Sequence, residues 1–199
     1  MKNEQLHELL YQALETEAGG VQVYETAVRC ALNSDLKEEW GKYLEQTRNH
    51  EKLMRQVLEA MGLDPARETK GRRIVRHKGE ALVEAMKLAL KADQPHAAQL
   101  VAAECVVSAE TKDHQNWELL GQAAAKLSGE SGEALRQACE QVEDEEDEHL
   151  YHSMGWSREL WIESLGLPAV LPPPEEKQDV KTAAGAAQAK KSRGAVLRS

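Results

Sequence analysis

Carboxylate and imidazole side chains interrupt the apolar faces of several predicted helices in this sequence of 199 residues. Glu17, His50 and Glu104 each stand in line with an apolar stripe of helical period. Glu146 and His149 are three residues apart in the sequence, so they share one face of a helix. A lone buried carboxylate is costly, whereas carboxylates and imidazoles that converge from different helices can share a cation. The pattern therefore predicts a metal site.

Long helices must position these side chains. Apolar residues recur at steps of three, four or seven, the period of one helix face, over residues 4–32, 34–61, 96–127 and 132–151. A basic connection over 66–78 and a shorter helix over 80–92 separate the second and third of these stretches, and a short Trp-containing segment follows at 156–166. We therefore predict an all-α, up-down four-helix bundle over residues 1–166, with a long crossover that carries an extra short helix.

The composition narrows the class of protein. The chain has no Phe, four Trp and four Tyr, which suits helices packed by small aliphatic side chains better than a β-sandwich. Its net charge of -9 argues against a general nucleic-acid binder. Neither a membrane span nor an apolar leader is recognisable, which predicts a cytoplasmic protein. Three widely separated cysteines are expected to be reduced thiols within the fold.

The character of the chain changes at residue 167. Prolines, including Pro172, Pro173 and Pro174, are followed by a stretch rich in Ala, Gly and Lys. We predict that residues 167–199 form a disordered tail, because such a composition offers little apolar surface to bury. A solubilising role is the simplest interpretation, and a docking peptide or an anion-binding arm are the alternatives.

The residues singled out above resemble the ferritin-like superfamily, which includes ferritins, bacterioferritins and rubrerythrins. Glu17 and Tyr24 match its E-x6-Y pattern, and Glu146 and His149 match its E-x-x-H motif. The resemblance covers roughly residues 4–155 and implies a carboxylate-bridged metal site of Fe or Mn, with Glu104 as the carboxylate of the third long helix. It also implies a role for Tyr24 in catalysis, as a hydrogen-bond donor or redox relay beside the metal.

The second long helix departs from the family pattern. Where a second E-x-x-H motif is expected, Thr47 stands three residues before His50, and a neutral hydroxyl is a poor ligand for Fe or Mn. The neighbouring Glu45 and Glu51 lack the helical phase to replace it. The predicted ligands are therefore Glu17, His50, Glu104, Glu146 and His149. They are expected to hold one ion or a weakened pair of ions.

Two further polar groups have simpler interpretations. Glu110, Asp113 and His114 are expected to form hydrogen bonds and ion pairs between helices, with support of the metal ligands or a separate metal site as the alternatives. The basic connection over 66–78 is expected to be a solvated crossover, with binding of an anion as the alternative.

Two functions of different classes follow. The first is a ferritin-like metal-binding protein that handles iron or acts on O2 or peroxide, which leaves open a ferroxidase-like or peroxidase-like oxidoreductase. The second is a non-catalytic helical scaffold or oligomerisation protein that has lost the di-iron site, an interpretation favoured by Thr47. Under either function the expected partners are metal ions and further copies of the chain, and neither a membrane nor nucleic acid.

Overall fold

A computed structural model describes residues 2–92 and 94–198, and within these ranges all regular secondary structure is helical. This confirms the prediction of an all-α protein. The helices are α1 (Asn3–Cys30), α2 (Ser34–Ala60), α3 (Lys70–Lys91), α4 (Pro95–Ala124), α5 (Gly129–Ser164), α6 (Pro174–Lys177) and α7 (Ala183–Val196).

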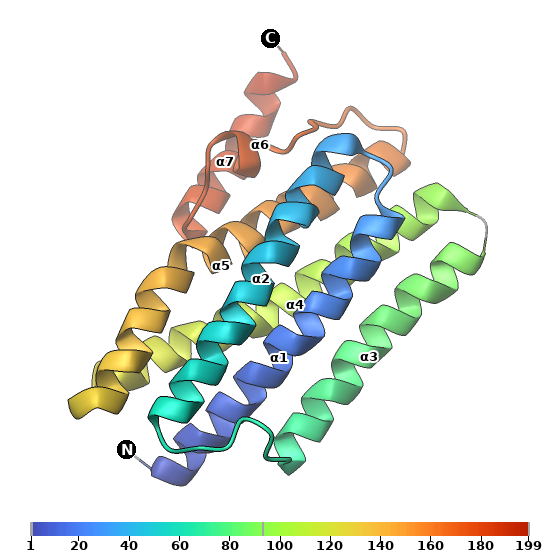
Figure 1. Ribbon diagram of the computed structural model, residues 1–199. Helices are drawn as coiled ribbons and strands as arrows, with labels where there is room; N and C mark the ends of the chain where they lie inside the picture. The colour runs from blue at the N-terminus through green and yellow to red at the C-terminus, as the bar shows by residue number, and fades with distance from the viewer. Residues whose placement is uncertain (1, 93, 199) are drawn as a thin grey trace.

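The long helices α1, α2, α4 and α5 lie side by side, and each runs opposite to its neighbour (Figure 1). α1 packs against α2 and α4, and α5 packs against the same two helices, so the four surround a common interior. α3 lies outside this group, against α1 and α4. Because every one of the four faces the interior along its length, a side chain at mid-helix can meet side chains from the other three.

The interior consists of two apolar clusters. One contains Trp40 and Tyr24, and the other contains Leu14, Leu58 and Leu135. The buried acids and histidines described below lie along the same helices between these groups. Apolar packing at both ends keeps these polar side chains away from water.

α3 begins at Lys70, so most of the predicted basic connection is helical. The hydroxyl of Thr69 accepts a hydrogen bond from the Arg72 amide and caps the helix. Arg72 is buried, and both Arg72 and Arg76 bind the carboxylate of Glu15 on α1. The expectation of a solvated crossover was therefore wrong for Arg72, which is a buried ionic partner of Glu15.

α5 is one continuous helix through the region where the sequence suggested a break near residue 151. Gly155 lies in this stretch, and a Cβ atom there would meet Oε2 of Glu175 at 2.7 Å. The glycine thus permits close packing of the following segment on α5 without ending the helix.

Residues 167–198 do not form the disordered tail that composition suggested. α6 and α7 pack on α5 near its carboxyl-terminal half (Figure 1). The fully buried Glu159 accepts hydrogen bonds from the amide of Val170 at 2.8 Å and from Arg193, while Arg158 binds Glu175. Composition missed this order because a few buried ion pairs, rather than a large apolar surface, fix the segment.

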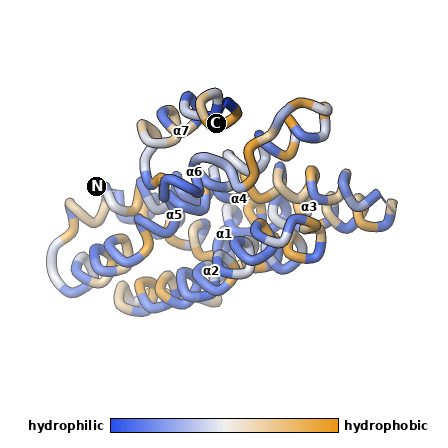
Figure 2. The backbone as a smooth tube through the Cα atoms, turned by 90° about the horizontal axis from the view of Figure 1, so that it is seen from above, coloured by the Kyte–Doolittle hydropathy of each residue, from blue (hydrophilic) through white to orange (hydrophobic). Residues whose placement is uncertain are grey.

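None of the helices in the described ranges combines the length and the hydropathy that a membrane crossing requires. Figure 2 shows that hydrophilic and hydrophobic residues alternate along each long helix. The three cysteines are free thiols, with Cys30 and Cys105 buried.

Candidate metal centre

Four of the predicted ligands meet in the interior. Glu17 comes from α1, His50 from α2, and Glu146 and His149 from α5. Their exposed fractions are between 0% and 2%. Nδ1 of His50 lies 2.9 Å from Oε1 of Glu146 and 3.9 Å from Oε2 of Glu17, and Nδ1 of His149 lies 3.7 Å from Oε1 of Glu146. These four side chains, predicted from the apolar stripes of the sequence, therefore lie close enough together to bind one small ion.

The structure does not bring the fifth predicted ligand, Glu104, to this place. Glu104 is exposed and accepts a hydrogen bond from Nε1 of Trp161 at 2.9 Å. α4 instead contributes Glu110 and Asp113, which are 3% and 4% exposed. Oε2 of Glu110 lies 3.5 Å from Nδ1 of His149. Their position matches the alternative in which they support the metal ligands rather than the expected network between helices, so α4 presents a different face to the interior than the sequence predicted.

The inward face of α4 was detectable in the sequence, although small residues mark its first part. Its buried positions advance by three or four residues along Ala103, Val106, Glu110, Asp113, Trp117 and Leu120. The larger residues Leu100 and Val101, which pointed to Glu104, are only partly buried. Glu104 and Glu110 differ by six positions, or about 120° around a helix of 3.6 residues per turn. Side-chain size thus misled the assignment.

The ligand atoms form two groups that share one residue. His50, Glu146 and His149 make one group, and Glu17, Asp113 and Glu146 make the other. Within each group the three ligand atoms all lie within 4.8 Å of one another. Such an arrangement can hold two cations with Glu146 between them, or a single cation in either group.

Many polar atoms of this cluster have no hydrogen-bond partner, and the 2.9 Å contact between Nδ1 of His50 and Oε1 of Glu146 lacks the geometry of a hydrogen bond. They are Oε2 of Glu17, Nδ1 of His50, Oε2 of Glu110, Oδ1 of Asp113, both carboxylate oxygens of Glu146 and Nδ1 of His149. Each buried polar atom without a partner costs roughly 1–3 kcal/mol. Since these atoms all belong to the same cluster, one or two cations would satisfy them together. The mixed carboxylate and imidazole donor set fits Fe or Mn.

The remaining atoms of several ligands are held by neighbours. Nε2 of His50 lies 2.7 Å from Oε2 of Glu145, and Nε2 of His149 lies 3.0 Å from Oε1 of Gln46. These acceptors favour a proton on Nε2, which leaves Nδ1 of each ring free to bind a metal. The indole of Trp117 donates to Oε1 of Glu17 at 2.6 Å. The surroundings therefore orient the ligands toward the centre of the cluster.

The acids of the cluster strongly perturb one another. Burial, together with the nearby Asp113 and Glu146, raises the pKa of Glu17 well above its usual value. Burial and the charges of Glu146 and Glu110 likewise raise the pKa of Asp113. Burial and the charge of Glu110 raise the pKa of Glu146 to about 8. A cation at the centre would oppose this crowding of negative charge and favour the ionised carboxylates.

Thr47 and Tyr24 differ in their relation to the centre. The Thr47 hydroxyl donates to the carbonyl oxygen of Tyr43 at 2.9 Å, so it is bound to its own helix rather than offered as a ligand. The Tyr24 ring is fully buried, with its centroid 5.9 Å from that of His149. Burial and the neighbouring Glu110 raise the pKa of Tyr24, so the phenol keeps its proton.

His114 behaves as predicted, whereas its two neighbours do not. Its Nε2 lies 2.8 Å from Oδ1 of Asp147, which makes an ion pair between α4 and α5 when the imidazole is protonated. Glu110 and Asp113 face the interior because they lie on another side of the same helix. The sequence cluster thus divides into a surface pair and two residues of the candidate centre.

Comparison with protein-family models, with curated proteins and with solved structures found no match.

Proposed function

We propose that this chain is a ferritin-like metal-binding protein whose buried centre holds Fe or Mn. The order of the helices supports the proposal, since four long antiparallel helices with a long connection after the second are typical of ferritin-like bundles. The chemistry of the interior supports it more strongly, because buried carboxylates and histidines project from all four helices.

One observation carries the proposal. Two groups of ligand atoms share Glu146, whose two carboxylate oxygens are both buried and without hydrogen-bond partners. A carboxylate in this position can bridge two ions. The geometry favours a pair of ions over the single ion that Thr47 suggested, because Asp113 supplies a carboxylate that the sequence pattern had not included.

A pair of Fe or Mn ions supplies two-electron redox chemistry toward O2 or peroxide. The surrounding residues suit that chemistry in three ways. Apolar clusters exclude water, Glu145 and Gln46 fix the imidazoles, and Tyr24 places a protonated phenol beside Glu110. We therefore propose iron handling or reduction of O2 or peroxide as the activity.

Metal analysis tests the proposal. Metal-free protein is loaded with Fe(II) or Mn(II) without oxygen, and the bound metal per chain is measured by elemental analysis after gel filtration. We expect up to two ions per chain, and Glu146→Gln, which keeps the shape but removes the shared charge, should abolish both. Glu104→Gln is the matched control, because this exposed glutamate of α4 is remote from the cluster and should leave the metal content unchanged.

The same measurement tests a second candidate function, a helical scaffold that has lost its metal centre. Thr47 favours this alternative, because its hydroxyl is bound to the helix backbone where the family pattern expects a bridging carboxylate. Wild-type protein that takes up neither Fe(II) nor Mn(II) would contradict metal binding and support the scaffold. A cytoplasmic location and self-association stay predictions of the sequence.

A further inference from the structure

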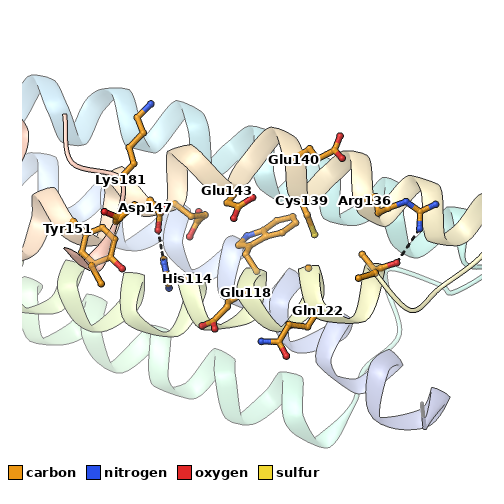
Figure 3. A pocket seen from close by; sticks show the side chains of 17 residues that line it. His114, Glu118, Gln122, Arg136, Cys139, Glu140, Glu143, Asp147, Tyr151 and Lys181 are labelled. Atoms are coloured by element: carbon orange, nitrogen blue, oxygen red, sulfur yellow. Dashed lines mark hydrogen bonds and ion pairs between the residues drawn. The ribbon is translucent and has the colours of Figure 1, made fainter. Parts of the chain in front are cut away.

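A cavity between α4 and α5 opens at the surface, and Glu146 of the candidate metal centre lies in its wall. Its volume is about 680 Å³. Glu118 and Gln122 of α4 line one side of it, and Glu140 and Glu143 of α5 line the other, as Figure 3 shows. The buried residues Trp117 and Glu146 also line it, so the inner wall of the cavity includes the residue that both ligand groups share.

The acidic side chains of this cavity are not neutralised by their neighbours. Among the described residues, Glu118, Glu140 and Glu143 are exposed and form no ion pair. Asp147 pairs with His114, which is charged only when protonated. The outer part of the cavity therefore carries negative charge that is free to attract a cation.

The two basic residues of the lining are bound elsewhere. Arg136 donates to the carbonyl oxygens of Ala124 and Leu127 and to Glu133. Lys181 binds Glu148 at 3.1 Å and Asp144 at 3.4 Å, and Figure 3 shows its side chain directed away from Glu140 and Glu143. Neither basic side chain is therefore placed to neutralise the exposed glutamates of the cavity.

The inner end of the cavity offers the groups that a cation needs after it has lost water. Glu146 is 2% exposed, and both of its oxygens lack a hydrogen-bond partner. The size is also suitable. Six water molecules of roughly 30 Å³ each occupy about 180 Å³, so a hydrated ion fits well within the 680 Å³ of the cavity.

A second cavity of about 470 Å³, between α1, α3 and α4, makes a useful contrast. Its lining is mainly apolar and includes Lys78 and Lys112, and it does not include Glu146. This second cavity therefore has neither the free negative charge that would attract a cation nor contact with the shared ligand Glu146.

We propose that the cavity between α4 and α5 is the route by which hydrated divalent cations reach the centre. This inference rests on the proposed metal binding. Glu118, Glu140 and Glu143 attract the ion, and Glu146 replaces its water at the inner end. If the cavity is the route, substitutions in it should change the rate of metal uptake and leave the amount of bound metal unchanged.

Charge substitutions test the attraction. The uptake of Co²⁺, used as a probe ion, is followed by stopped-flow absorption and tryptophan fluorescence. Glu140→Gln/Glu143→Gln should slow uptake by about threefold to tenfold at low ionic strength, with a smaller effect in high salt and an unchanged final stoichiometry. Glu84→Gln/Glu163→Gln is the matched control, because it removes the same charge from exposed positions outside the cavity and should have little effect.

A bulky side chain tests the path itself. Gly121 lines the cavity, and a Cβ atom there would meet no atom within 4 Å. Gly121→Trp should slow both uptake and release of Co²⁺ to a similar degree and leave the equilibrium affinity nearly unchanged. Gly41→Trp is the matched control, since this glycine of α2 also has open space and lies outside the cavity.

The outcomes separate the route from the metal centre. Normal Co²⁺ binding with rates that neither the charge variant nor Gly121→Trp alters would overturn the route and leave the proposed function intact. Wild-type protein that binds no Co²⁺, Fe(II) or Mn(II) would overturn both.

Discussion

Glu15 and Glu17 are two buried glutamates on the same helix, two residues apart, with different surroundings. Glu15 faces α3, where Arg72 binds it at 2.9 Å and Arg76 at 2.6 Å. Glu17 faces the interior, where it meets His50, Asp113 and Glu146 rather than an arginine or lysine. Two residues correspond to about 200° around a helix, so the two side chains point to nearly opposite sides.

The two environments have opposite effects on the acids. Burial raises the pKa of Glu15, but hydrogen bonds from Arg76 and Arg72 outweigh it, and the net result is a lowered pKa. For Glu17, burial and neighbouring acids act in the same direction and raise the pKa. A carboxylate with permanent cationic partners stabilises the fold, whereas a carboxylate among other acids stores unfavourable energy that an external cation can relieve.

The largest expected effect comes from removal of an arginine that binds Glu15. Arg72→Ala removes a buried partner of Glu15 and the hydrogen bonds from Arg72 to the carbonyl oxygens of Pro65 and Arg67. We expect the free energy of unfolding to fall by about 3 kcal/mol, measured by urea denaturation. The exposed neighbour Arg73→Ala serves as the control and should change it by less than about 0.5 kcal/mol. Equal losses in both variants would contradict a special role for the Glu15 pair.

Substitution of the interior acid, Glu17, should instead increase the free energy of unfolding. Glu17→Gln keeps an oxygen for the Trp117 hydrogen bond and removes one charge from the crowded cluster. We expect metal-free protein at pH 8 to gain roughly 1–2 kcal/mol of unfolding free energy. Glu15→Gln, the same chemical change on the other face of α1, should instead destabilise the protein. Destabilisation by both substitutions would show that Glu17 is not strained in the absence of metal.

The stability of the metal-free protein should also depend on pH in two opposite ways. The pKa of Glu15 is lowered on folding, so its stabilisation is present above pH 4.5 and is lost as the pH falls below that value. The pKa of Glu146 is raised from 4.5 to about 8, so metal-free protein should lose stability as the pH rises across this interval. Thermal melts of chelator-treated wild type and Glu146→Gln check this, and the second loss should be much smaller in the variant. A stability that rises between pH 5 and 8 in chelated wild type would contradict it.

The sequence predicted the helices well and their inward faces less evenly. In α1, α2 and α5, large apolar residues such as Leu14, Trp40 and Val142 mark the buried stripe, and the side chains in phase with them, including Glu17 and His149, are buried as expected. In α4, alanines mark the first part of the stripe, and the larger Leu100 and Val101 lie on the partly buried face that leads to Glu104. A stripe that joins Ala103 and Val106 to Trp117 and Leu120 passes through Glu110 and Asp113.

By itself, then, the sequence determined an all-helical chain and the presence of acids and histidines on its apolar stripes, because both depend on spacing within one helix. Only the tertiary structure decided which face of α4 turns inward, that Thr47 bonds to its own helix, and that residues 167–198 are folded. These features depend on contacts between segments distant in the sequence. Glu159 with Arg193 and Glu15 with Arg72 are such contacts, and neither is visible in a local pattern.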